Sequence, residues 1–384
     1  MGAGLEADLF GNVRKPLDEA SWLPRRLYVD PAIYDVEMQR IHKREWLYCA
    51  HVSAIPKPGD FSTLTLLDQP LLIVRGQDDA VRCFYNVCRH RGMAVAEGNG
   101  HARQFRCPYH AWAYDTQGQL IEAPMMERTR DFRLCDIRLR EVRSEIFHGM
   151  VFINFDDDAA ALGPRIADLG ELISPWQVAQ MTPAGHDEFT GDFNWKVLVE
   201  NAIEGYHIIA AHSESAGGFA PAELSYSTDD GGRAWHDLYT PYVTSIDVKV
   251  AGAQIPGLPS WARERGTFLS LHPQFMITLN PDNVGIVAIT PLGPQRTRFD
   301  ATVFMPRERT RSDASIGAFL EWAKVINRED EQVCKGVQRG VNSDGWSPPR
   351  YSHLEKSVWQ FHNWYLDRMV GRRAQPVLSR DAAR

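Results

Sequence analysis

Two short segments of the chain each hold one cysteine and one histidine. They are Cys88 and His90, spaced C-x-H, and, after sixteen further residues, Cys107 and His110, spaced C-x-x-H. Two thiolates and two imidazoles are the ligand set of a [2Fe–2S] cluster in which two histidines replace two cysteines on one of the irons. Each segment would then give one ligand to each iron, with the thiolates on the inner iron and the imidazoles on the outer one.

A structural zinc ion is the alternative for these four ligands. Zinc also binds two cysteines and two histidines, but its sites usually begin with two cysteines separated by two to four residues. Here each segment mixes the two ligand types, and the C-x-H spacing is short for chelating one tetrahedral ion. The spacing therefore favours the iron–sulfur cluster over zinc.

A second group of candidate ligands, His207 and His212, lies near the end of the segment 194–212. The apolar positions of this segment, among them Val197 and Leu198, fit a helix with one buried face. Residues five apart on an ideal helix point about 140° apart, so the two histidines share a metal only if the helix ends or distorts between them. Two histidines and one carboxylate form the facial triad of non-haem Fe(II) sites, which leaves coordination positions for O₂ and substrate.

The carboxylate of such a triad is expected far downstream, in a helix predicted over roughly residues 314–340. Three consecutive acids lie there, and Asp330 is the predicted ligand, with Glu329 and Glu331 as its competitors. Taken alone, three acids in a row are more often a solvated helix face, and a lone His-x₄-His pair is more often structural. The prediction therefore depends on both motifs following the cysteine–histidine segments in one chain.

Over nearly its whole length the chain resembles the α subunit of a Rieske non-haem iron oxygenase. The matching residues are the two cysteine–histidine segments, the block from Asn194 to His212, Glu329-Asp330 with Val337-Gln338-Arg339-Gly340, and residues 358–365. The resemblance implies an α+β fold. An N-terminal Rieske [2Fe–2S] domain of antiparallel β-strands would precede a catalytic domain with a large antiparallel sheet covered by helices.

Three regions are expected on this basis. Residues 1–44 would form a helical segment that packs on the catalytic domain, residues 45–156 the Rieske domain, and residues 157–384 the catalytic domain with the mononuclear iron. A charge-rich helix is predicted over residues 37–47, and the short strand-like runs after it, separated by Gly, Asp and Pro, predict antiparallel sheet.

The resemblance also gives a role to Glu204. In the family, an acidic residue three positions before the first triad histidine connects an iron-ligating histidine to a cluster histidine of another subunit. Here the partner subunit's His110 is the expected cluster histidine, in a homotrimer. Most ring-hydroxylating members have aspartate at this position. Glutamate is similar to the branch that acts on carnitine, glycine betaine and related quaternary amines.

The function implied is that of a terminal oxygenase component that mono-oxygenates a small organic substrate with O₂, by hydroxylation or oxidative N-dealkylation. A quaternary amine is one candidate substrate. Electrons would come from NAD(P)H through a separate reductase with flavin and iron–sulfur centres, or through a ferredoxin. One alternative is hydroxylation of an aromatic ring or aromatic acid, suggested by Gly205 and Ile208 in place of cysteines common in the amine branch. Two further alternatives are a Rieske-type electron carrier and a binding or interaction module held together by zinc.

Four aromatic residues are candidates for a substrate pocket, because aromatic walls suit a cationic ammonium group. They are Trp235, Tyr239, Tyr242 and Phe275. The alternative is that they are ordinary core residues that never meet.

Composition agrees with a two-domain enzyme. A chain of 384 residues with 44% hydrophobic content can bury large cores, and a net charge of −7 argues against a nucleic-acid partner. No apolar run reaches the ~18 residues of a membrane span, and the first residues do not form a secretory signal. The remaining cysteines are scattered singly, as expected for reduced thiols in a cytoplasmic protein without a membrane partner; they are Cys49, Cys83, Cys135 and Cys334.

Overall fold

Three antiparallel β-sheets form the framework of the computed structural model, which describes residues 10–218, 220–229, 231–243, 255–308 and 313–371. The seven-stranded sheet has the order β1 (Leu47–His51), β10 (Met150–Asn154), β9 (Glu141–Phe147), β4 (Val81–Tyr85), β3 (Gln69–Arg75), β2 (Asp60–Leu66) and β5 (Asn99–His101). A small sheet extends from it, with the order β6 (Gln104–Arg106), β7 (Ala113–Asp115) and β8 (Leu120–Glu122).

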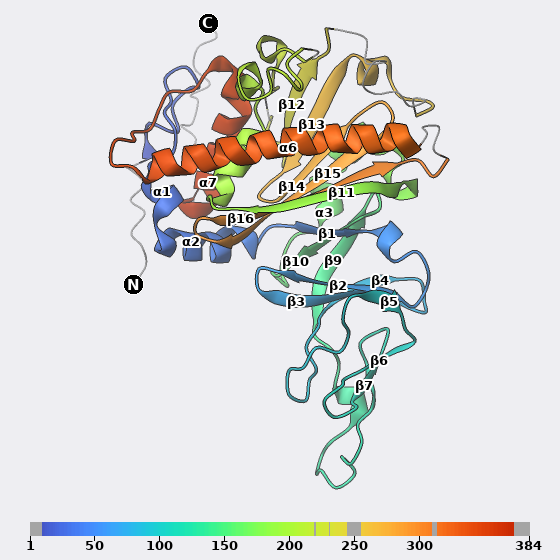
Figure 1. Cartoon of the computed structure of the whole chain (residues 1–384). Helices are drawn as coiled ribbons and strands as arrows, with labels where there is room; N and C mark the ends of the chain where they lie inside the picture. The colour runs from blue at the N-terminus through green and yellow to red at the C-terminus, as the bar shows by residue number, and fades with distance from the viewer. Residues whose placement is uncertain (1–9, 219, 230, 244–254, 309–312, 372–384) are drawn as a thin grey trace, which may run out of the picture.

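The third sheet has six strands, which lie between residues 182 and 305 of the chain. Its order is β11 (Thr182–Gly191), β16 (Arg296–Met305), β15 (Val284–Gly293), β14 (Phe275–Leu279), β13 (Arg265–Leu271) and β12 (His236–Pro241). Figure 1 shows this sheet above the seven-stranded one, with the small sheet at the far lower end. The α+β fold with an antiparallel N-terminal part is confirmed.

Helices cover the six-stranded sheet. The α-helices are α1 (Arg26–Val29), α2 (Pro31–Glu37), α3 (Leu162–Arg165), α4 (Ala167–Ile173), α5 (Trp195–Ala202), α6 (Asp313–Asn342) and α7 (Lys356–Met369). A π-helical turn, η2 (Met38–His42), continues α2, and the 3₁₀ helices are η3 (Val52–Ala54), η4 (Leu134–Asp136), η5 (Ser174–Trp176), η6 (Val178–Gln180), η7 (Tyr206–Ile209), η8 (Ala222–Leu224), η10 (Ser260–Arg263) and η11 (His353–Glu355). In Figure 1, α6 runs across the sheet beside β11, and it also contacts α5.

The predicted helix over residues 37–47 is wrong at both ends. The helix begins at Pro31, where Asp30 accepts a hydrogen bond from the N–H of Ala32 as a cap, and its π-helical turn ends at His42. Leu47 instead begins β1 and pairs with Ile153 of β10. Leu47 adopts a strand instead of a helix because pairing with β10 buries it in the core of the seven-stranded sheet.

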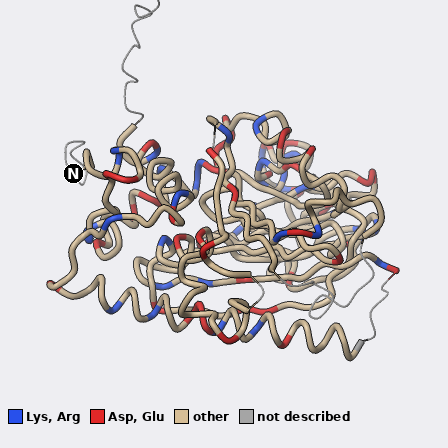
Figure 2. The backbone as a smooth tube through the Cα atoms, turned by 90° about the horizontal axis from the view of Figure 1, so that it is seen from above, with Lys and Arg blue, Asp and Glu red and all other residues tan. Residues whose placement is uncertain are grey.

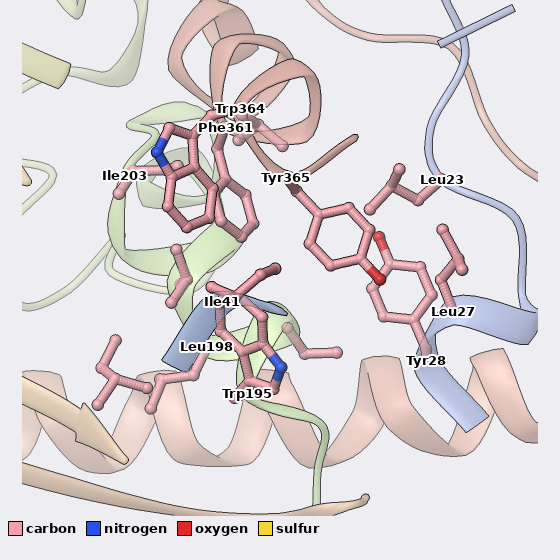
Figure 3. Close-up of a cluster of buried hydrophobic side chains, with 14 of the residues drawn as sticks. Leu23, Leu27, Tyr28, Ile41, Trp195, Leu198, Ile203, Phe361, Trp364 and Tyr365 are labelled. Carbon is pink, nitrogen blue, oxygen red and sulfur yellow. The ribbon is translucent and has the colours of Figure 1, made fainter. Parts of the chain in front are cut away.

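One hydrophobic core joins the N-terminal segment to α5 and α7, as Figure 3 shows. Leu23, Leu27 and Tyr28 pack there with Trp195 of α5 and Tyr365 of α7, all at most 3% exposed. Burying one large apolar side chain contributes roughly 1.5–3 kcal/mol. The core therefore fixes α5, which leads directly into the candidate metal ligands.

A buried ion pair fixes the same helix. Lys196 Nζ lies 2.5 Å from Glu37 Oε1, and both side chains are fully buried. Glu37 also accepts hydrogen bonds from Trp195 Nε1 and from the Tyr365 hydroxyl. Removing one partner of a buried pair costs about 3–5 kcal/mol, because it leaves an uncompensated charge. This network ties α2, α5 and α7 together.

Charged residues of both signs are interspersed along the chain, as Figure 2 shows. Among the described residues, no helix combines the length and the apolar character needed to cross a membrane.

Candidate metal centres

The two cysteine–histidine loops have the same backbone geometry. In the first, the Cys88 N–H donates to the Met93 carbonyl and the Gly92 N–H donates back to the Cys88 carbonyl. In the second, Cys107 makes the equivalent pair of bonds with Trp112 and Ala111. Gly92 and Ala111 both have positive φ, +79° and +59°. Each loop is therefore a tight turn that a few local hydrogen bonds hold closed.

The loops place their thiols inside and their imidazoles outside. Cys88 and Cys107 are each 3% exposed, whereas His90 and His110 are exposed at the surface with ring centroids 4.5 Å apart. The His90 ring stacks on Trp112 at 4.8 Å. This is the inner and outer arrangement that a [2Fe–2S] cluster with two histidine ligands needs.

The four residues fit a two-iron cluster better than a single ion. Two groups of three candidate ligands have donor atoms within 4.8 Å of one another in the described part of the chain, and neither group includes a cluster-loop residue. A single tetrahedral zinc would bring its four donors that close. Burial and the neighbouring Cys88 thiol raise the pKa of Cys107, while backbone N–H groups of Tyr109 and His110 lower it, so these N–H groups would stabilise a thiolate.

One of the two groups of three is His207, His212 and Asp330. Helix α5 ends at Ala202, and the short helix η7 carries His207, so the helix does end before His212, as sharing a metal requires. Asp330 Oδ1 lies 3.1 Å from His212 Nε2 and 3.5 Å from His207 Nε2. The three side chains predicted from the sequence therefore converge.

The three acids of α6 point to three different partners. Asp330 faces the two Nε2 atoms, whereas Glu329 accepts from His212 Nδ1 at 2.7 Å. Glu331 pairs with Lys335 at 2.7 Å and with Arg328 at 3.6 Å. Successive helix residues are 100° apart, so the three acids point in different directions and only Asp330 reaches the Nε2 atoms.

Both histidine rings are held from behind by a carboxylate. Glu204 Oε1 lies 2.6 Å from His207 Nδ1, and Glu204 Oε2 accepts from the N–H groups of Tyr206 and His207. Asn201 Nδ2 donates to Asp330 Oδ1 at 2.7 Å. The sequence did not predict this bond, nor the Glu329–His212 bond, because each joins segments more than a hundred residues apart.

The surroundings of His212 favour a positive charge on its ring. Burial lowers the pKa of His212, but hydrogen bonds and charges from Asp330 and Glu329 outweigh burial and raise the pKa above its usual value. A site that favours a proton between two carboxylates also suits a metal cation.

Comparison with known protein families decides the identity. A family model for the "Ring hydroxylating alpha subunit (catalytic domain)" matches residues 178–371, which is 194 of the 384 residues, and one for the "Rieske [2Fe-2S] domain" matches residues 45–133. The chain belongs to the ring-hydroxylating α-subunit family of Rieske oxygenases. It is therefore an oxidoreductase that incorporates O₂, with a [2Fe–2S] cluster and a mononuclear iron, and it receives electrons from NAD(P)H through a reductase.

Individual relatives cover most of this oxygenase. The glycine betaine monooxygenase oxygenase subunit of Chromohalobacter salexigens is 27% identical over 91% of this chain and 86% of the relative. The 2-aminobenzenesulfonate 2,3-dioxygenase α subunit of an Alcaligenes species is 31% identical over 74% of each. A solved quaternary ammonium Rieske monooxygenase, described in relation to carnitine oxidation, has a TM-score of 0.83 at 24% identity and covers 95% of this chain and 99% of its own, which shows the fold.

The four candidate pocket aromatics lie in different surroundings in this oxygenase. Trp235 and Phe275 are 3% and 2% exposed in one hydrophobic core, and the Trp235 indole N–H donates to Asp168. The Arg265 guanidinium lies 3.9 Å from the centroid of the Tyr239 ring. A substrate ammonium over that ring would meet an existing cation. Burial raises the pKa of Tyr242, which lies close to Gly266 near the start of β13. The aromatic cage is therefore not part of the proposed site.

Proposed function

We propose that this oxygenase mono-oxygenates a small quaternary amine, by hydroxylation or oxidative N-dealkylation. The observation that carries the proposal is the bond from Glu204 to His207 Nδ1, because it gives the longer acid of the amine-oxidising branch a place beside the iron site. The similarity to the glycine betaine monooxygenase subunit over 91% of the chain supports the same substrate class.

In this proposal Cys88, Cys107, His90 and His110 hold the cluster. His207 and His212 would bind Fe(II) through Nε2, and Asp330 would bind it through its carboxylate. When bound, the cluster supplies electrons and the iron supplies open coordination positions for O₂ beside the substrate. Glu204 and Glu329 accept the Nδ1 hydrogens and so keep the Nε2 lone pairs toward Asp330. Asn201 holds the Asp330 carboxylate.

A homotrimer is part of the proposal, because the two metal centres of one chain lie apart. The cluster loops adjoin β6 and β7 at the lower end in Figure 1, whereas Asp330 belongs to α6, which crosses the upper part of the molecule. Glu204 has a 10% exposed side chain, and its Oε1 already contacts His207. The same carboxylate would accept a second imidazole N–H from the partner subunit's His110. Electrons would reach each cluster from a reductase with flavin and iron–sulfur centres, directly or through a ferredoxin.

Oxygen uptake tests the substrate class. The iron-loaded oxygenase, supplied with a reductase and NADH, is screened against glycine betaine, carnitine and choline and against a set of aromatic acids. We expect substrate-dependent uptake with product formation for a quaternary amine. Uptake with aromatic acids alone would contradict the proposal.

Hydroxylation of an aromatic ring is the second candidate. It is supported by the 31% identity to the 2-aminobenzenesulfonate dioxygenase subunit and by Gly205 and Ile208, which replace cysteines common in the amine branch. Product analysis from the same screen separates the two candidates, because an aromatic product carries a ring hydroxyl and an amine product does not.

A further inference from the structure

We propose that Glu329 and Ser215 act as a positioning pair for His212, and that this pair, rather than Glu204, determines how tightly the mononuclear site holds Fe(II). The inference rests on the proposed ligand set. It assigns different roles to Glu204 and Glu329, although each of these carboxylates contacts the Nδ1 atom of one histidine.

The contacts of Glu329 join α6 to the turn that carries His212. Glu329 Oε2 lies 2.7 Å from His212 Nδ1 and accepts from the Ser215 hydroxyl at 2.6 Å. Ser215 lies in the same turn as the ligand, since its own N–H donates to the His212 carbonyl at 3.1 Å. The Trp322 indole N–H of α6 donates to the Ser215 carbonyl at 3.3 Å. One carboxylate therefore binds both the ring and its supporting turn.

The chemistry of these contacts sets the direction of the ring. An ionised carboxylate only accepts hydrogen bonds, so Nδ1 of His212 carries a hydrogen, and Nε2 is the nitrogen that can exchange a proton for a metal ion. That Nε2 faces Asp330 at 3.1 Å. Glu329 and Asp330 are adjacent on the rigid helix α6, so a single helical turn supplies both a candidate ligand and the group that orients a second ligand.

Glu204 makes a different kind of contact. It is three residues before His207, and its second oxygen accepts from the N–H groups of Tyr206 and His207. These contacts are local, and they hold the ring within its own loop without tying the loop to α6. Loss of Glu204 should therefore leave the distance between the loop and Asp330 unchanged.

The simpler alternative is that Glu329 is a helix-surface acid. Its side chain is 29% exposed, and it faces an open trough on α6 of about 700 Å³, lined by Ala211, Glu321, Lys324, Val325, Arg328 and Gln332. His212, however, is only 3% exposed, so the bond from Glu329 reaches a buried ring. Glu331 is the matched comparison, because its partners Lys335 and Arg328 are both on the helix surface.

Fe(II) affinity is the decisive measurement. Anaerobic protein with an intact cluster is stripped of mononuclear iron and refilled against a chelator. We expect Glu329→Gln to weaken Fe(II) binding about 10- to 100-fold, the usual range for partners behind a metal ligand. Ser215→Ala should weaken Fe(II) binding by a smaller factor. Ser215→Thr should bind Fe(II) as the wild type does, because threonine keeps the hydroxyl. Glu331→Gln should also match the wild type.

The outcomes separate this inference from the proposed function. Wild-type affinity in Glu329→Gln overturns the inference, as does an equal loss of affinity in Glu204→Gln. If Asp330→Ala keeps its iron while Glu329→Gln loses it, the proposed ligand set itself is wrong. An unchanged cluster absorption spectrum and unchanged oligomer size in each variant show that the protein has folded.

Discussion

The cluster loops collect their four candidate ligands from residues 88–110, whereas the candidate iron site joins His212 to Asp330, 118 residues further along the chain. The cluster loops are closed by hydrogen bonds between residues of the same loop. The iron site depends on the packing of α5 and α6, and α5 is fixed by the buried pair Lys196–Glu37. Damage to the catalytic core should therefore remove mononuclear iron and leave the cluster in place.

Asp330→Ala should give the largest effect and separate the two regions most clearly. The variant loses the carboxylate that lies 3.1 Å from His212 Nε2, so we expect about one of three irons per chain to be lost and turnover to be abolished. Iron analysis and the visible spectrum check this result, since the cluster absorption should stay unchanged. Glu331→Ala is the control, because Glu331 pairs with Lys335 and does not face the histidines. Retention of all three irons in Asp330→Ala would contradict the ligand assignment.

His90→Cys perturbs the other region. A thiolate in place of an imidazole raises electron density on the outer iron, so the cluster reduction potential should fall by on the order of 250 mV. Redox titration followed by absorption measures the change, and the mononuclear iron content should stay constant. His101→Asn is a matched control in the same part of the chain, because His101 is exposed and pairs with Asp60. A wild-type potential in His90→Cys would remove the cluster assignment.

Glu204→Gln tests the connection between the regions. The amide cannot accept from two imidazoles as a carboxylate does, so multiple-turnover activity should fall about 10- to 100-fold. Both metal centres should remain, and the reductase should still reduce the cluster. The measurement is the rate of reoxidation of the reduced cluster in the presence of substrate and O₂. Near-normal turnover, or a catalytically competent monomer, would contradict transfer between subunits.

The same contrast explains what could be predicted from the sequence. The cluster residues could be predicted because their spacing is local, and Gly92 indicated the tight turn. His207, His212 and Asp330 were predicted because their motifs follow the cysteine–histidine segments in one chain, and the structure shows that α5 ends at Ala202, before both histidines. Spacing alone could not choose among three consecutive acids, because the choice depends on how α6 is rotated against the histidine loop.

The partners behind the ligands could not be predicted in the same way. Glu329 was considered only as a competing ligand, and its bond to His212 Nδ1 follows from the packing of α6. The pocket prediction shows the same limit. Trp235 and Phe275 lie buried in one hydrophobic core, and nothing in their spacing distinguishes a core from a binding wall.

The smallest predicted effect is on the pH dependence of stability, and it comes from His42, which packs on Trp195 at the start of α5. This histidine is fully buried against the edge of Trp195, and neither ring nitrogen has a hydrogen-bond partner. Burial, with a smaller contribution from the Lys196 charge, lowers the pKa of His42 to about 3. In the unfolded chain the ring has a pKa of about 6.5 and takes up a proton that the folded protein excludes. Stability from the neutral ring is therefore complete above about pH 6.5 and is lost as the pH falls toward 3.

His42→Leu removes this contribution to acid sensitivity while keeping a side chain of similar bulk. At pH 5.5, one unit below the pKa of the unfolded chain, exclusion of the proton lowers the free energy of unfolding of the wild type by about 1.4 kcal/mol. The variant has no imidazole at this position and does not lose this amount. Denaturant unfolding of the two proteins at pH 7.5 and 5.5 measures the difference. The variant should lose less stability between these pH values, while the cluster spectrum is the same in both proteins. Some acid sensitivity should remain, because burial also lowers the pKa of His272 in the same core. An identical loss in both proteins would mean that His42 is protonated in the folded state, and that the base of α5 is more accessible to water than its burial indicates.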